Sequence, residues 1–181
     1  MKRHLISARP GNGKTRYLVH TATELLQAGK KVAILAFELT ENELRNHFNV
    51  SPQITILDCY QHTPKQVERL LSQYNFDALL VDCVNLCLTH EGDDVLLNRD
   101  FQEVSEALEA IAQSHNADLY LTRQLSRSVD ERENKQPVLE DLYKYEKDYD
   151  SITSLCYDQI QANVINIVDL KTQTHAQLII K

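Results

Sequence analysis

The sequence predicts an α/β fold in which a mainly parallel central sheet is flanked by helices. Short apolar runs alternate with segments of helical periodicity along most of the chain. Residues 32–37 are continuously apolar, as expected for a central parallel strand covered on both faces. Helix-start signals at Thr40 and Thr63 separate such runs. This alternation favours right-handed crossovers and ligands bound beyond the carboxyl ends of the strands.

The first half of the chain gives the clearest elements. Strands are expected over residues 5–8, 32–37, 54–57, 78–82 and 119–121. A helix begins at about Lys14, with Leu18, Ala22 and Leu25 on one face, and Gly29 ends it.

The helix-start signals are capping boxes, in which two residues satisfy each other's free backbone amides. Glu43 follows three residues after Thr40, and Gln66 three residues after Thr63. Proline at position 64 suits the first turn of a helix. A further helix is expected over residues 101–111, where apolar residues repeat at helical spacing.

The last third of the chain is less regular. Residues 123–147 are polar and indicate no clear element. Three apolar runs, over residues 152–156, 164–168 and 176–180, then predict strands that close the sheet. The last two are expected to form a hairpin that turns near Thr172.

Composition predicts one domain over residues 1–181. The formal charge of −7 gives no broad basic surface, so nucleic acid would be contacted by a few side chains or by an assembled ring. No apolar run approaches the roughly 20 residues that span a bilayer, and no signal peptide is recognisable, so we expect a cytoplasmic protein without a membrane segment. The four cysteines, beside apolar runs and without a CxxC pair, are expected to be buried and reduced.

A glycine loop follows the first strand and opens the first helix. Residues 8–15, Ala-Arg-Pro-Gly-Asn-Gly-Lys-Thr, match the Walker A pattern GxxxxGK[ST] except at Ala8. In such a loop Gly13 lets backbone amides surround the phosphates of ATP, Lys14 reaches the β and γ oxygens, and Thr15 binds Mg2+. The predicted ATP-binding residues are Arg9, Pro10, Gly11, Asn12, Gly13, Lys14, Thr15 and Arg16.

Three side chains at strand ends join Lys14 as candidates for catalysis. Asp82 would be the Walker B carboxylate that holds Mg2+, although parallel strands also end in Asp to cap helices. Glu38, expected beside the neighbours of the glycine-loop strand, would polarise the attacking water, or it is a surface carboxylate before the next helix. Gln124 would bind the γ-phosphate and transmit its loss to the loop that follows, or it is a solvated loop residue.

Together these segments resemble the C-terminal motor domain of the DnaB family of hexameric replicative helicases. Residues 8–10 before the Gly-Lys-Thr triplet are similar to that family's own Walker A variant. Residues 36–39 are similar to its strand with the catalytic glutamate, and residues 80–82 to its Walker B strand. The resemblance is ordered along nearly the whole chain, and it implies a RecA-like P-loop NTPase fold and hydrolysis of ATP with Mg2+.

The most specific part of the resemblance is residues 124–132, Gln-Leu-Ser-Arg-Ser-Val-Asp-Glu-Arg, followed by residues 135–137 and 141–142. This run is similar to the helicases' sensor glutamine and DNA-facing loop. On this likeness Arg127, Arg132 and Lys135 are candidates for contacting the phosphates of single-stranded DNA. The alternative is an exposed loop of mixed charge.

The chain also departs from the family. Residues 1–181 contain no counterpart of its N-terminal helical domain or of the linker helix that docks on the neighbouring subunit, and residues 143–146 replace a glycine-containing stretch. Lys171 matches a lysine that acts in trans on the next subunit's γ-phosphate, whereas Gln173 stands where the family has an arginine. Because an arginine finger accelerates hydrolysis by orders of magnitude, slow turnover or dependence on another protein's arginine is expected.

Two hypotheses of function follow. The first is a DnaB-like ATPase that acts on single-stranded DNA in replication or recombination as a helicase-type motor, with a homo-oligomeric ring as its possible assembly. The second is an ATP-binding module that docks on a full-length replicative helicase as a loader, decoy or regulator. The presence of Glu38 favours turnover and hence the first hypothesis.

Overall fold

A single mixed sheet forms the centre of the molecule. The computed structural model describes residues 1–89, 100–126, 129, 131–132, 137–158, 161 and 163–179. In this part of the chain the sheet has eight strands in the order β3-β2-β4-β5-β1-β6-β7-β8. Their bounds are β1 Arg3–Ala8, β2 Val32–Ala36, β3 Thr55–Asp58, β4 Ala78–Asp82, β5 Asp118–Gln124, β6 Ser151–Tyr157, β7 Val164–Asp169 and β8 His175–Ile179.

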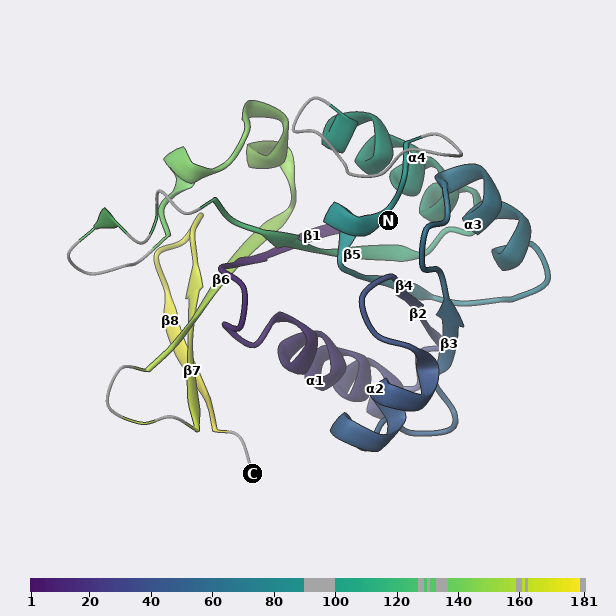
Figure 1. The fold of residues 1–181 in the computed structure, drawn as a ribbon, viewed down its shortest axis with the longest axis horizontal. Coiled ribbons are helices and arrows are strands. Elements are labelled where there is room, and N and C mark those ends of the chain that lie inside the picture. Colours follow the sequence, from purple (N-terminus) through teal and green to yellow (C-terminus); the bar gives the residue numbers. More distant parts are fainter. Residues whose placement is uncertain are drawn as a thin grey trace.

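Helices cover both faces of the parallel part of the sheet. The α-helices are α1 Lys14–Gln27, α2 Glu41–Phe48, α3 Pro64–Leu71 and α4 Asp100–Ser114. Short 3-10 helices are η1 Val84–Leu86, η3 Leu139–Asp141 and η4 Lys144–Asp148. As Figure 1 shows, α1 and α2 lie on one side of the sheet and α3 and α4 on the other. The predicted α/β architecture with a mainly parallel sheet is confirmed.

Two apolar clusters hold these layers together. Leu18 and Ala22 of α1 and Leu44 of α2 pack against one face of the sheet, with Ile34 of β2. On the other face, α3 and α4 pack on residues such as Leu79 of β4. The central strands are buried along their whole length, as β2 and β4 show. This explains why their sequences are apolar runs rather than alternating patterns.

Local signals in the sequence set the helix ends as predicted. The Thr40 hydroxyl accepts from the Glu43 amide at 3.3 Å, and the Glu43 carboxylate accepts from the Thr40 amide at 2.8 Å. The same reciprocal capping begins α3 at Thr63. At the end of α1, Gly29 adopts a φ of 80°, a left-handed conformation that glycine adopts without strain.

The C-terminal strands differ from one another in direction. The strand β6 pairs parallel to β1, so it extends the parallel part of the sheet. The strands β7 and β8 run antiparallel and form the predicted hairpin at the edge of the sheet, with Thr172 in its turn. In Figure 1 this hairpin, in yellow-green, stands out from the helices and the parallel strands.

A buried ion pair joins the end of β5 to the polar stretch that follows it, and the sequence pattern does not indicate this pair. The side chains of Arg123 on β5 and Glu146 on η4 are 7% and 0% exposed and form a salt bridge. The Arg123 guanidinium lies over the rings of Phe101 and Tyr143, at 5.1 and 4.5 Å from their centroids. The Tyr143 amide donates to Glu146 at 2.6 Å. The segment around residues 143–146, whose polar sequence suggests a surface loop, is therefore bound to β5 close to α4.

Two expectations about the chain's environment can be compared with the structure. Cys59, Cys83 and Cys87 are buried free thiols, as predicted, whereas Cys156 is half-buried. Burial raises the pKa of Cys59 and Cys87 to about 12. Among the described residues, no helix combines the length and the apolar character needed to cross a membrane.

We expect Arg123→Met to lower the free energy of unfolding by about 3–5 kcal/mol, because it leaves the Glu146 charge buried without its partner. The double variant Arg123→Met/Glu146→Gln removes both charges and keeps an acceptor for the Tyr143 amide, so it should recover much of that loss. Urea denaturation measures both. Arg69→Met, at an exposed site on α3, should change stability by less than about 0.5 kcal/mol. A double variant as unstable as the single one would contradict the ion-pair explanation.

Candidate active site

The motifs predicted from the sequence meet at the carboxyl edge of the sheet, the edge at which the parallel strands end. The strand β1 lies between β5 and β6, and Ala8 is the register partner of Gln124. Two strands further along, Ala36 of β2 is the register partner of Asp82 on β4. The glycine loop, Glu38, Asp82 and Gln124 therefore all lie at this carboxyl edge. Glu38 is not beside the glycine-loop strand's neighbours, because β4 and β5 separate β2 from β1.

The glycine loop is shaped by two residues with positive φ. Gly11 and Gly13 have φ values of 75° and 80°, which favour glycine over residues with a side chain. A Cβ at Gly13 would also lie 2.4 Å from the Ile165 side chain of β7. The loop is closed by the Asn12 amide, which donates to the Arg9 carbonyl at 3.2 Å. These constraints explain why the motif needs glycine at position 13.

The start of α1 provides a favourable environment for an anion. Gly13 is the N-cap and offers no side-chain oxygen to the free amides of the first turn, and that turn contains no acidic residue. The amides and the helix dipole therefore remain available to a negatively charged group. Lys14, the first residue of α1, is only 7% exposed.

Asp82 is buried at the end of β4 and lacks full hydrogen bonding. Its side chain is 1% exposed, and Oδ1 accepts from the Thr122 hydroxyl at 3.1 Å. The other oxygen, Oδ2, has no hydrogen-bond partner among the described residues. Burial raises the pKa of Asp82, and the Thr15 hydroxyl close to it has the opposite effect. A buried carboxylate with one unsatisfied oxygen next to Thr15 fits a site for a divalent cation.

Glu38 is exposed and held close to Asp82 by the backbone. The amides of Phe37 and Glu38 both donate to the Asp82 carbonyl, at 2.7 and 3.3 Å. The negative charge of Glu38 contributes to the raised pKa of Asp82. The carboxylate therefore lies at the carboxyl edge with access to solvent, as a group that acts on water must.

Gln124 lies at the end of β5 with an exposed side chain. Its amide donates to Asn85 Oδ1 of η1 at 2.7 Å. The next residue, Leu125, donates its amide to the Ala8 carbonyl at 2.9 Å, and its carbonyl accepts from Arg9 Nη1 at 2.9 Å. The guanidinium of Arg9 thus connects the glycine loop to the loop that follows Gln124.

Several predicted residues make contacts that the sequence pattern does not indicate. Asn12 Oδ1 accepts from the Tyr157 amide at 3.3 Å and so ties the glycine loop to the end of β6. Arg16 lies with its Cζ 5.6 Å from the centre of the Phe48 ring, at the end of α2.

Thr122 and Asn85 are polar residues of the site that the sequence analysis missed. Their only signal is their position next to Asp82 and Gln124.

The candidates for DNA contact divide into two groups. Arg127 and Lys135 lie outside the described residues. Arg132 is engaged within the chain, since two of its guanidinium nitrogens donate to the two carboxylate oxygens of Asp141. Its side chain is nevertheless 34% exposed. A phosphate would have to share this guanidinium with Asp141.

Lys171 and Gln173 lie in the turn between β7 and β8. Because Asp169 at the end of β7 is the register partner of Thr153 near the start of β6, this turn lies at the opposite edge of the sheet from the glycine loop. Gln173 has a φ of 59°, and its side-chain amide donates to the Leu170 carbonyl at 2.8 Å. Neither side chain can reach the glycine loop of its own chain.

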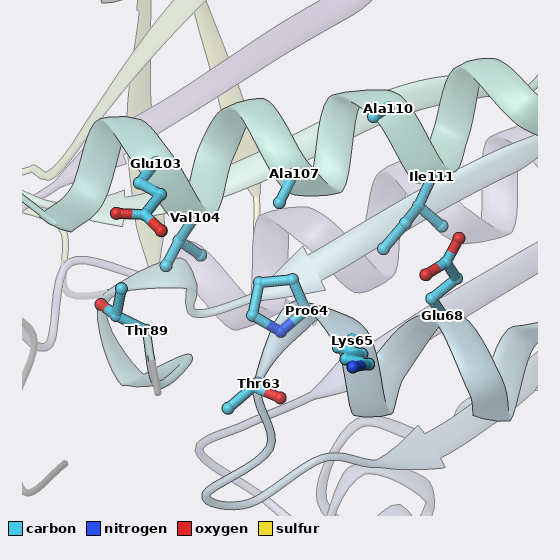
Figure 2. Close-up of a pocket in the computed structure, with 10 residues that line it drawn as sticks. All are labelled: Thr63, Pro64, Lys65, Glu68, Thr89, Glu103, Val104, Ala107, Ala110 and Ile111. Carbon is cyan, nitrogen blue, oxygen red and sulfur yellow. The ribbon is translucent and has the colours of Figure 1, made fainter. Parts of the chain in front are cut away.

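A separate cavity of ≈ 800 Å³ lies between α3 and α4 (Figure 2). The side chains of Val104 and Ala107 on α4 face Pro64 at the start of α3 across it, and Glu103 and Lys65 also line it. None of its lining residues belongs to the predicted ATP site. The cavity therefore provides no alternative location for the motif chemistry.

Comparison with known proteins identifies the family of the chain. A family model described as the DnaB-like helicase C-terminal domain matches residues 47–181, and the glycine loop and Glu38 precede the match. The replicative DNA helicase DnaB of Rickettsia bellii (strain RML369-C) is 34% identical over 77 residues, which are 42% of this chain. These residues span only 15% of that helicase.

Two solved structures share the fold over nearly the whole chain. One, the structure of an ATPase domain, superposes with a TM-score of 0.76 at 19% identity, covering 98% of this chain and 80% of that one. A DnaB-like replicative helicase, studied with its interactions with primase, gives a TM-score of 0.78 at 18% identity, covering 98% of this chain and 54% of that one. The fold is that of RecA-like helicase domains. The chain belongs to the family of DnaB-like helicase C-terminal domains.

Proposed function

We propose that the chain binds ATP with Mg2+ at the carboxyl edge, hydrolyses it, and acts on single-stranded DNA as part of a helicase-type motor. The observation that carries the proposal is the convergence of the glycine loop, Asp82, Glu38 and Gln124 at one edge of the sheet. A module that only bound nucleotide would not need a solvent-accessible carboxylate beside the buried Asp82. Family membership supports action in DNA replication.

Each residue has a defined part in this proposal. The free amides of α1 and the Lys14 ammonium bind the phosphates, and the Thr15 hydroxyl and Asp82 hold Mg2+. When bound there, Mg2+ would supply positive charge to balance the charge that develops on the phosphate oxygens. The described residues contain no cluster of three or more His, Cys, Asp or Glu side chains suited to a metal, so the cation would need phosphate oxygens as further ligands.

The residues around the phosphates would then govern turnover. Glu38 orients the attacking water and accepts its proton, because it is exposed and lies next to Asp82. Gln124 hydrogen-bonds the γ-phosphate. Since Arg9 and Ala8 both bind Leu125, loss of that phosphate would be transmitted to the loop that carries Arg127 and Arg132. Arg127, Arg132 and Lys135 are the proposed contacts to DNA phosphates.

A second candidate is an ATP-binding module that docks on a full-length replicative helicase. It is favoured by Gln173, whose amide closes its own turn and carries no charge for a neighbour's γ-phosphate. Turnover separates the two candidates, because only the first requires hydrolysis of ATP by this chain.

The central test compares two substitutions at the site. Lys14→Ala should abolish the rise in melting temperature caused by Mg-ATP, which corresponds to about 2.7 kcal/mol at a ligand concentration of a hundred times Kd. Glu38→Gln should keep that rise and lose turnover, because the carboxylate acts on water rather than on the phosphates. Glu68→Gln on α3 is the control and should keep both. An undiminished shift in Lys14→Ala would place the nucleotide elsewhere, and parental turnover in Glu38→Gln would rule out its role.

Asp82→Asn should separate stability from activity. The substitution removes a buried charge and keeps the bond from Thr122, so the ligand-free protein should melt higher, by about 2–4 °C for each kcal/mol gained. Stabilisation by ATP should no longer respond to Mg2+, as for the parent protein in EDTA. Calorimetry with and without Mg-ATP measures both effects. A lower melting temperature of the ligand-free variant would mean that the Asp82 charge stabilises the fold.

Gln173→Arg should raise turnover at least several-fold, since an arginine acting in trans is worth about 10³–10⁵ in rate where it is fully placed. Because the turn lies at the opposite edge from the glycine loop, the gain needs a second chain and should grow with protein concentration. Gln177→Arg on β8 adds the same charge to the same hairpin and serves as the control. Equal turnover per chain for parent and variant at every concentration would show that no shared site forms.

A further inference from the structure

Backbone pairing at the end of β5 extends further towards β1 than towards β4. Towards β1, parallel pairing continues to the last residue, with Ala8 opposite Gln124. Towards β4, pairing stops earlier, with Val81 opposite Leu121. The last three residues of β5 therefore have no backbone partner on the side of Asp82.

Side chains replace the missing backbone pairing on that side. The Thr122 hydroxyl lies 3.0 Å from the Val81 carbonyl and 3.1 Å from Asp82 Oδ1. Two residues later, Asn85 Oδ1 accepts from the Gln124 amide at 2.7 Å. The Asn85 oxygen thus occupies the place that a carbonyl of β4 would have if the ladder continued.

The position of Asn85 suits this role. It belongs to η1, which begins two residues after Asp82, so only the buried residues Cys83 and Val84 separate the two side chains along the chain. The orientation of its amide group follows from its partners, because an N–H donor must face the oxygen. The Cys83 thiol also donates to this oxygen, at 3.2 Å. Both contacts fix Oδ1 towards Gln124.

The backbone therefore determines where the Gln124 side chain lies. That side chain is exposed. The backbone amide of Gln124, in contrast, donates to Asn85, and the backbone amide of Leu125 donates to the Ala8 carbonyl. The glycine loop holds one side of this segment and the residues after Asp82 hold the other. Loss of the Asn85 contact would leave Gln124 attached to the glycine loop alone.

We propose that Asn85 is a positioning residue that sets the distance between the Gln124 side chain and the Mg2+ site at Asp82. The proposal rests on the proposed ATPase function and deepens it. Asn85 touches neither nucleotide nor water in this role, since it acts through the Gln124 backbone. Removing it should slow turnover with little effect on nucleotide binding, because the glycine loop and α1, rather than Gln124, provide most of the proposed contacts to the phosphates.

A double-mutant cycle in the full chain tests this. Asn85→Ala should lower kcat on the order of ten- to a hundred-fold, as small misplacements of catalytic groups do, while Kd for Mg-ATP stays within about two-fold. Asn85→Asp keeps an oxygen in the same place and should restore much of the rate. In a Gln124→Ala background Asn85→Ala should have little further effect. Leu86→Ala, at the exposed neighbour in η1, is the matched control and should behave as the parent.

Hydrogen exchange of the Gln124 amide provides a readout that does not depend on activity. Asn85→Ala should speed its exchange, whereas Asn85→Asp and Leu86→Ala should not. Unchanged exchange in Asn85→Ala, or rate losses that multiply in the double variant, would overturn the positioning role while turnover by the parent protein leaves the ATPase function intact. Absence of turnover by the parent would overturn the proposed function itself, and with it the reaction for which Asn85 is positioned.

Discussion

The parallel pairing of β1 with β5 is the constraint on which the rest of the site depends. Because Ala8 is opposite Gln124, the glycine loop and Gln124 leave the sheet side by side. The pairing of β5 with β4 and of β4 with β2 then brings Asp82 and Glu38 to the same edge. A shift of one residue in any of these pairs would turn a whole strand to its other face. The site is therefore a property of sheet register rather than of any single motif.

Several residues at this edge lower the stability of the folded protein. Lys14 and Asp82 are charged and almost completely buried, and one oxygen of Asp82 has no partner among the described residues. Gly11 and Gly13 lose more conformational entropy on folding than other residues would, because glycine is less restricted in the unfolded chain. A packed core would be more stable without such groups. Phosphates and a divalent cation would offset these costs, which supports a site built for a ligand.

The sequence was a good guide where the physics is local. Apolar runs predicted the central strands, and the pairs Thr40–Glu43 and Thr63–Gln66 predicted helix starts. Strand order could not be predicted, since pairing of β1 between β5 and β6 depends on contacts between residues far apart in the chain. For the same reason the buried ion pair between Arg123 and Glu146, which are 23 residues apart, could not be predicted from the sequence. A charged residue reads as exposed until its partner is known.

The hairpin of β7 and β8 connects two distant parts of the molecule. At its start, Ile165 packs against Gly13 of the glycine loop, and at its end the chain turns through Lys171 and Gln173 at the opposite edge. This turn cannot reach the glycine loop of its own chain. Under the proposed function, any contribution of Lys171 to a bound γ-phosphate would have to be made to another chain. Turnover that used Lys171 would therefore depend on assembly, even though the residues proposed to bind the nucleotide all lie within one chain.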